Sequence, residues 1–228
     1  SNCPGKNAIA VAELTMAFIL ALDRRIPDSV AELRAGKWNK KEYSKSRGLK
    51  GSTLGIVGMG RIGAEAAKRA LAFEMRVLWY DVIPDYNPLA HADCKRSDLD
   101  TIFREADIVT LHVPGTGDTK HLVNAARLAT MKPHALLINT SRASVIDEPA
   151  LAAALRDKKI RAAAVDVYDN EPAADAKDNA SPLCDLANLY GTHHIGASTD
   201  QAQAAVAEET VRIVEEFKKS GKARNAVN

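Results

Sequence analysis

A glycine-rich loop between two strand patterns constrains the fold of this chain more than any other feature. Residues 58–63 read GMGRIG, which has the spacing G-x-G-x-x-G. The apolar run at 53–57 predicts a buried strand before the loop, and residues 61–73 predict a helix after it. A second strand is predicted over 75–80 and ends at Asp81. Strand, glycine loop, helix, strand and acid in this order indicate a dinucleotide site.

Each glycine of the loop has a physical task in such a site. Gly58 permits a tight turn, Gly60 lets a pyrophosphate approach the backbone, and Gly63 lets the helix pack closely on the strand. The N–H groups and positive dipole end of the helix face the phosphates. Asp81 lies 18 residues beyond Gly63, where its carboxylate can bind both hydroxyls of an adenosine ribose. A glycine-rich turn in an unrelated α/β protein would leave Asp81 without a role.

Asp81 also favours one form of the cofactor. A carboxylate at this position repels the 2′-phosphate of NADP. The next residues, 82–85, supply no arginine or lysine that could bind that phosphate. We therefore predict that the chain binds NAD(H) and that no cation lies near Asp81.

The composition excludes several classes of protein. The 228 residues are enough for one large or two small domains, and 46% of them are apolar, which allows a substantial core. With 31 basic and 29 acidic side chains the net charge is +2, so nothing indicates nucleic-acid or membrane binding. The apolar segment 8–22 is too short to span a bilayer. Cys3, Cys94 and Cys184 have no metal-ligand spacing, so we expect free thiols, a cytoplasmic location and no metal site.

From residue 53 onward, strand patterns alternate with helix patterns. This alternation predicts a parallel sheet with helices on both faces, the α/β doubly wound (Rossmann) dinucleotide-binding fold. The other strands are expected at 107–112, 135–139, 160–165 and 187–190, and the other helices at 9–25, 28–35, 98–105, 121–130, 147–157 and 199–219. The ligand of such a fold binds beyond the carboxyl ends of the strands.

Polar residues follow several of these predicted strands. In chain order they are a turn at 112–114, Arg142, Asp166, Glu171 and His194. An arginine can hold a carboxylate through two hydrogen bonds, and a histidine can exchange a proton near neutral pH. A carboxylate can orient that histidine. Together these groups suit hydride transfer at a 2-hydroxy acid, with the cofactor carrying the hydride.

Each of these residues also has an ordinary structural interpretation. Arg142 alone could form a salt bridge at a helix start, and Glu171 could be an acid of an exposed loop. His193 and His194 could be surface residues, and we expect that one of them is. Their joint occurrence at successive strand ends is what favours a site.

Five motifs carry a resemblance to a known family. They are NAIAVAEL at 7–14, the glycine loop at 55–63, NTSRASVID at 139–147, DVYDNEP at 166–172 and HIGASTDQAQ at 194–203. Together they resemble the D-isomer-specific 2-hydroxyacid dehydrogenase family over essentially the whole chain. HIGAST followed by Ala-Gln, and the terminal residues 225–228, look most like the branch that acts on 3-phosphoglycerate in serine synthesis.

The resemblance implies a role for each matching residue. Arg142 would bind and polarise the substrate, His194 would be the acid/base, and Glu171 would pair with His194. Asp166 would contact the nicotinamide amide. The rest of the cofactor site would comprise Arg61 and Ile62 at the pyrophosphate, Asp81 at the ribose, and His112, Pro114, Thr140, His194 and Gly196.

The chain departs from the family pattern in two loops and in its extent. Ala143-Ser144 replaces the usual Gly-Gly or Gly-x, and His193 replaces the usual proline. Either change can alter a loop, because glycine and proline set backbone angles that other residues do not. The resemblance leads us to expect that the separate substrate domain of the family is absent from residues 1–228. We interpret the chain as an NAD-binding domain with an interdomain and dimerisation segment over about residues 1–50.

Two segments each have two interpretations, and three functions are compatible with the sequence. The predicted helix at 9–22 is apolar nearly all round, so either its own domain buries it or, as the resemblance favours, a homodimer does. The basic stretch at 37–47 is either a solvated surface or a cationic rim for a phosphorylated substrate. The resemblance favours an NAD-dependent 3-phosphoglycerate dehydrogenase. A glyoxylate/hydroxypyruvate-type reductase and a non-catalytic, NAD-sensing scaffold of corepressor type are the alternatives.

Overall fold

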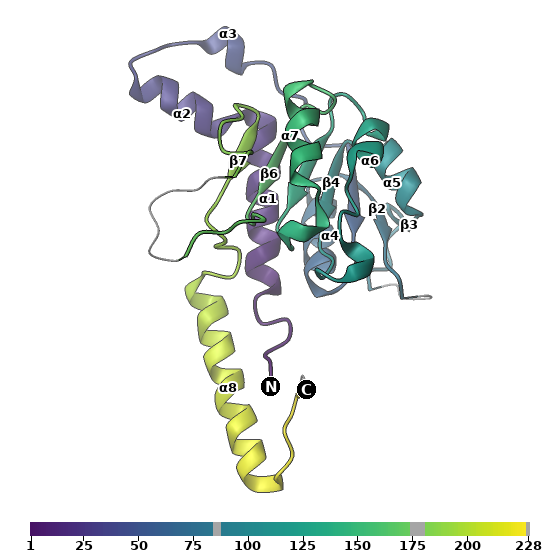
Figure 1. The fold of residues 1–228 in the computed structure, drawn as a ribbon, viewed down its shortest axis with the longest axis vertical. Helices are drawn as coiled ribbons and strands as arrows, with labels where there is room; N and C mark the ends of the chain where they lie inside the picture. Colours follow the sequence, from purple (N-terminus) through teal and green to yellow (C-terminus); the bar gives the residue numbers. More distant parts are fainter. Residues whose placement is uncertain (84–87, 174–180, 227–228) are drawn as a thin grey trace.

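A parallel sheet of seven strands forms the centre of the protein (Figure 1). The strand order is β3-β2-β1-β4-β5-β6-β7, and every neighbouring pair is parallel. The strands are β1 (Thr53–Val57), β2 (Arg76–Tyr80), β3 (Cys94–Arg96), β4 (Ile108–Leu111), β5 (Leu136–Asn139), β6 (Ala162–Val165) and β7 (Leu189–Gly191). The winding reverses between β1 and β4, so the loops after these strands diverge and leave a crevice. The predicted doubly wound fold is confirmed.

The computed structural model describes residues 1–83, 88–173 and 181–226. Pro84-Asp85, used above to predict cofactor choice, and the terminal Val227-Asn228, part of the family resemblance, lie outside these ranges. Within them, no helix combines the length and the apolar character needed to cross a membrane. The three cysteines are free thiols, as expected.

Helices cover both faces of the sheet. They are α1 (Ala8–Arg24), α2 (Ile26–Arg34), α3 (Lys40–Tyr43), α4 (Arg61–Ala72), α5 (Leu99–Glu105), α6 (Ala125–Thr130), α7 (Glu148–Arg156) and α8 (Asp200–Ser220), with short 3₁₀ turns at Gly117–Thr119 and Ala143–Val145. Ile19 of α1 and Ala67 of α4 belong to the core on one face. Phe103, Leu128 and Leu151, from α5, α6 and α7, belong to the core on the other.

The sequence patterns missed β3 and misplaced the start of α6. β3 is an edge strand of three residues, two of them charged and exposed, so no apolar alternation reveals it. The helix predicted over 121–130 begins only at Ala125, because the Asn124 side chain caps it by accepting a hydrogen bond from the Arg127 N–H. Val123 instead forms an isolated β-bridge with Ile146.

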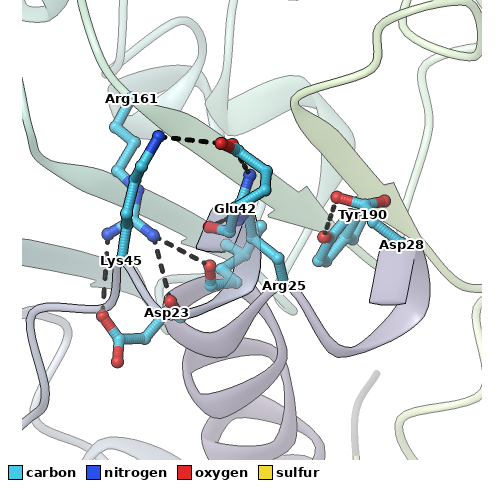
Figure 2. A network of polar contacts seen from close by, with 8 residues as sticks. Asp23, Arg25, Asp28, Glu42, Lys45, Arg161 and Tyr190 are labelled. Carbon is cyan, nitrogen blue, oxygen red and sulfur yellow. Dashed lines mark hydrogen bonds and ion pairs between the residues drawn. The ribbon is translucent and has the colours of Figure 1, made fainter. Parts of the chain in front are cut away.

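Polar contacts attach the end of α1 and the start of α2 to the side of the sheet formed by β6 and β7 (Figure 2). Asp23 is buried at the end of α1, with its Oδ1 3.6 Å from Nη1 of Arg161. The Tyr190 hydroxyl on β7 donates to the Asp28 carboxylate on α2 at 2.8 Å. Neither α2 nor α3 buries a residue in the core. The two helices therefore project from the sheet at the end of the molecule opposite α8 (Figure 1).

Candidate active site

The glycine loop has the shape that the sequence predicts. Gly58 has φ +94°, and a Cβ there would lie 2.6 Å from the His112 carbonyl oxygen. A Cβ on Gly63 would collide with the Gly58 carbonyl oxygen, so α4 packs against the loop only because Gly63 has no side chain. A Cβ on Gly60 would meet nothing within 4 Å, so the space above this residue is open.

The start of α4 is suited to a pyrophosphate. Gly60 is its N-cap and offers no side chain to the first N–H groups of the helix. Those groups, from Arg61 and Ile62 onward, can bind an anion together with the positive end of the helix dipole. The residues present therefore fit a dinucleotide at this end of the sheet.

Asp81 lies at the end of β2, beside this loop. Its Oδ2 accepts a hydrogen bond from the Met59 N–H at 2.8 Å, and its Oδ1 accepts one from the Ile83 N–H at 3.1 Å. The expectation that no cation lies near Asp81 is wrong. Nη2 of Arg96 donates to the Asp81 carbonyl oxygen at 2.8 Å. Arg96 lies on β3, the strand that the sequence patterns missed, so reading only the residues that follow Asp81 could not find it.

A cleft of about 220 Å³ lies beyond the carboxyl ends of the central strands. Eight of the predicted site residues line it: Ile62, His112, Pro114, Thr140, Arg142, Asp166, His194 and Gly196. Five lining residues were not predicted: Asn7, Val11, Val113, Ser141 and Ala197. All five lie in or beside the motifs at 7–14, 139–147 and 194–203 or the turn at 112–114, so the motifs could have indicated them.

His194 and Glu171 form a direct pair at the mouth of the cleft. Nδ1 of His194 and Oε2 of Glu171 are 2.8 Å apart, and half of the histidine side chain is exposed. The backbone of His194 has φ +54°, in the left-handed region. His193 is exposed too, but no acid among the described residues pairs with it, so the expectation that one of the two histidines is an ordinary surface residue fits His193.

Asp166 holds the turn that presents His194. This carboxylate is buried, and it accepts hydrogen bonds from the Ile195 N–H at 2.9 Å and the Gly196 N–H at 2.8 Å. It also accepts a hydrogen bond from the Thr192 hydroxyl. The family resemblance implies that Asp166 contacts the nicotinamide amide, and these three bonds within the protein were not predicted.

Arg142 projects from a rigid turn. The Asn139 side chain accepts hydrogen bonds from the N–H and the hydroxyl of Ser141, and it donates to the Arg142 carbonyl oxygen. Arg142 is exposed, and its guanidinium forms no ion pair with any described acid, so it is not part of a structural salt bridge. Ala143 and Ser144 form a 3₁₀ turn without positive φ, so the turn does not require the usual glycines.

His112 lines the cleft but is unsuited to proton exchange. Its Nε2 lies 3.1 Å from the Thr110 hydroxyl, and its Nδ1 is buried without a hydrogen-bond partner among the described residues. Burial of the ring lowers the pKa of His112 to about 3, so the ring is neutral at physiological pH. His194 is thus the histidine of the cleft that is open to solvent and paired with an acid.

Glu148, which was not predicted as a site residue, supports the loop that carries Glu171. It is buried at the start of α7, and its Oε1 accepts a hydrogen bond from the Asp169 N–H at 2.7 Å. Burial raises the pKa of Glu148 above its ordinary value. Glu148 directly follows the motif at 139–147, which was the available signal.

The basic stretch at 37–47 is far from this cleft within one chain. Asn7 and Val11 line the cleft at the start of α1, whereas the stretch follows the other end of that helix. α1 has 17 residues and is therefore about 25 Å long. Glu42 accepts hydrogen bonds from both Arg25 and Lys45 at 2.8 Å, which offsets part of the local charge (Figure 2). A cationic rim formed by this stretch now requires a neighbouring subunit.

Residues 16–196 match the sequence model of the D-isomer specific 2-hydroxyacid dehydrogenase, NAD binding domain. The chain belongs to this family. Its cofactor is therefore NAD, as Asp81 predicts. A D-3-phosphoglycerate dehydrogenase of Methanocaldococcus jannaschii is 42% identical over 231 residues, which are 100% of this chain and 42% of that protein. A hydroxypyruvate reductase of Thermotoga maritima is 42% identical over 220 residues, or 96% of this chain and 69% of the relative.

Solved structures agree with the family assignment. The structure of D-lactate dehydrogenase with NAD⁺ from Lactobacillus jensenii has a TM-score of 0.89 and 29% identity to this chain. That comparison covers 100% of this chain and 71% of the other. The chain spans less than half the length of its phosphoglycerate dehydrogenase relative from M. jannaschii.

Proposed function

We propose that the protein carrying this chain is an NAD-dependent D-2-hydroxyacid dehydrogenase whose substrate is 3-phosphoglycerate. The observation that supports the proposal best is the His194–Glu171 pair, 2.8 Å apart, at the mouth of a cleft that Arg142 also lines beside the glycine loop. A base, its orienting acid and a carboxylate-binding cation are the groups that oxidation of a 2-hydroxy acid requires.

Each residue has one task in this mechanism. Arg142 binds the substrate carboxylate through its guanidinium and polarises the oxygen on C2. His194 accepts the proton of the C2 hydroxyl on Nε2, because Nδ1 faces Glu171. The Glu171 carboxylate stabilises the imidazolium that forms. NAD, held at the glycine loop and Asp81, would supply the acceptor for the hydride that leaves C2. In the reverse direction His194 returns the proton to the oxygen of a 2-oxo acid.

The proposed function and its two alternatives differ in the substrate and in whether the protein catalyses a reaction at all. The phosphoglycerate assignment is supported by the terminal motifs and by relatives of that name. A hydroxypyruvate or glyoxylate reductase would keep Arg142, Glu171 and His194, and similar proteins with these names exist. A non-catalytic NAD-sensing scaffold needs no paired His194 and Glu171, so the geometry favours an enzyme.

A substrate panel tests the proposed function. The protein that carries this chain, with its substrate domain, is assayed with 3-phosphoglycerate, glycerate and lactate in the oxidative direction and with glyoxylate in the reductive direction. We expect NADH formation with the highest kcat/KM for 3-phosphoglycerate. Preference for glyoxylate would make the protein a reductase. NAD-dependent binding of a protein partner without turnover of any substrate would support the scaffold instead.

We also propose that a separate substrate domain packs against α8. This helix extends away from the sheet (Figure 1), and only two of its side chains, Ala202 and Glu209, are buried. Its exposed apolar residues are Val206, Val211, Val214 and Phe217. Such a set on one helix is suited to packing against another apolar surface.

The chain of 228 residues alone is therefore expected to bind NADH but to turn over 3-phosphoglycerate poorly. A missing domain leaves the substrate misplaced and open to water, and misplacement alone lowers rates by about 100-fold. Calorimetry measures binding, and absorbance at the NADH band measures turnover. Turnover by the chain alone at the rate of the longer protein would contradict the need for that domain.

We propose, further, that the chain forms a homodimer through α2 rather than α1. Most apolar residues of α1 are buried in its own domain, among them Val11, Met16, Phe18 and Ile19. Ile26, Val30 and Leu33 of α2 are spaced i, i+4 and i+7 and are all exposed, as is Trp38. This spacing places the three aliphatic side chains on one helix face, which no described part of the chain covers.

Sedimentation of the chain at micromolar concentration is expected to show a dimer. Val30→Glu combined with Leu33→Glu should give a monomer, because burying two carboxylates in an apolar interface costs several kcal/mol. Phe73→Glu, an exposed apolar residue after α4, is the matched control and should stay dimeric. A wild-type monomer, or dissociation by the control as well, would contradict an interface at α2.

A further inference from the structure

Arg96 is held beside Asp81, the residue that we expect to bind the adenosine ribose. Its position on β3 is paired with Trp79 on β2. The guanidinium carbon lies 5.4 Å from the centroid of the Trp79 ring, and Trp79 is only 2% exposed, so the ring is a rigid support. Nη2 of Arg96 donates to the carbonyl oxygen of Asp81 at 2.8 Å. The contact with the Trp79 ring and the hydrogen bond together hold the Arg96 guanidinium beside Asp81, which directly follows β2.

A negative and a positive group lie close together here: the carboxylate of Asp81, and the Arg96 guanidinium at the Asp81 backbone carbonyl. The Asp81 carboxylate faces the glycine loop, where it accepts hydrogen bonds from the Met59 and Ile83 N–H groups. The backbone carbonyl of Asp81 faces Arg96. The Arg96 guanidinium forms no ion pair with a described acid, and only one of its five N–H groups is used in the contact with Asp81. A cation with unused N–H donors therefore contacts the backbone of Asp81, the residue whose carboxylate is expected to bind the ribose.

We propose that Arg96 is a second determinant of cofactor choice, which acts against Asp81. A phosphate on the ribose 2′ oxygen meets the Asp81 carboxylate, which repels it, and the Arg96 guanidinium, which can bind it through two parallel hydrogen bonds. We expect NAD to remain the preferred cofactor, because the Asp81 carboxylate would bind the ribose hydroxyls, whereas Arg96 is exposed and solvent and salt weaken its attraction for a phosphate. The inference rests on the NAD assignment and not on the proposed substrate.

Removing the charge of Asp81 should reveal the attraction of Arg96 for the 2′-phosphate of NADPH. Asp81→Asn keeps a side-chain oxygen that can accept the Met59 N–H, so the loop retains its hydrogen bond. We expect this variant to bind NADPH about tenfold more tightly than the wild type, the effect of roughly one charge-assisted hydrogen bond. Its NADH affinity should fall, because an amide is a weaker acceptor for the ribose hydroxyls than a carboxylate.

The decisive variant adds Arg96→Gln to Asp81→Asn. Glutamine keeps a donor for the Asp81 carbonyl but carries no charge. The double variant should lose the tenfold gain for NADPH and bind NADH like Asp81→Asn alone. Arg76→Gln in the same background is the matched control, because Arg76 is an exposed arginine at the opposite end of β2. It should leave the affinities for both cofactors unchanged.

Calorimetric titration of the wild-type chain and the three variants with NADH and with NADPH, at low and at raised salt, measures these affinities. A loss confined to NADPH on Arg96→Gln, and smaller at high salt, supports the proposal. Equal NADPH affinity of Asp81→Asn with and without Arg96→Gln overturns it, as does an equal loss for both cofactors. Wild-type chain that binds neither cofactor would overturn the NAD assignment itself, which is a separate and recognisable result.

Discussion

Replacing His194 with asparagine is expected to lower kcat/KM for the 2-hydroxy acid by about 10²–10⁴-fold, the usual contribution of a positioned acid/base. Asparagine can still accept or donate a hydrogen bond at this position but cannot take the hydroxyl proton. NADH affinity should fall far less than kcat/KM, because the expected pyrophosphate and ribose contacts at the glycine loop and Asp81 are retained. Steady-state kinetics of the longer protein with its substrate domain, and calorimetry with NADH, give the two readouts.

The neighbouring histidine supplies the control for this prediction. His193→Asn makes the same chemical change one residue away, on a side chain that is exposed and does not pair with Glu171. It should leave kcat/KM nearly unchanged. Equal losses in the two variants would mean that the turn, and not the proton transfer, was damaged. Full activity of His194→Asn would remove this residue from the mechanism.

Most of the fold could be predicted because its signals are local. An apolar run, a glycine loop and a helix pattern that follow one another set β1, α4 and β2 without knowledge of the rest of the chain. The strand-end residues could then be grouped, because parallel strands have their carboxyl ends at one edge of the sheet. That rule brings Arg142, Asp166 and His194 to one cleft, as the structure shows.

What the sequence could not give depends on contacts between segments that are distant along the chain. Arg96 reaches Asp81 only because the unpredicted strand β3 pairs with β2. Asp166 is occupied by the turn after β7, so its bonds follow from the packing of β6 beside β7. His112 has the residue type of an acid/base, and only its burial lowers its pKa out of the useful range. Periodicity and motif spacing carry none of this information.

Gly63→Ala is expected to damage both stability and NAD binding. Its Cβ would collide with the Gly58 carbonyl oxygen, which is backbone and cannot rotate away. α4 must then move off β1, and such overpacking typically costs about 1–3 kcal/mol. The moved helix no longer directs its first N–H groups to the pyrophosphate. Chemical denaturation and calorimetry with NADH should both show a loss.

Gly60→Ala separates the two effects. A Cβ at Gly60 meets nothing within 4 Å, and the backbone there does not need positive φ, so the fold should keep its stability. The methyl group would instead occupy the space above the helix start. Displacing a pyrophosphate from two charge-assisted hydrogen bonds should lower NAD affinity on the order of 100-fold. Gly117→Ala, equally open but outside the G-x-G-x-x-G motif, should change neither quantity. Wild-type affinity in Gly60→Ala would mean that the pyrophosphate does not lie on this helix start, and the cofactor would have to bind elsewhere.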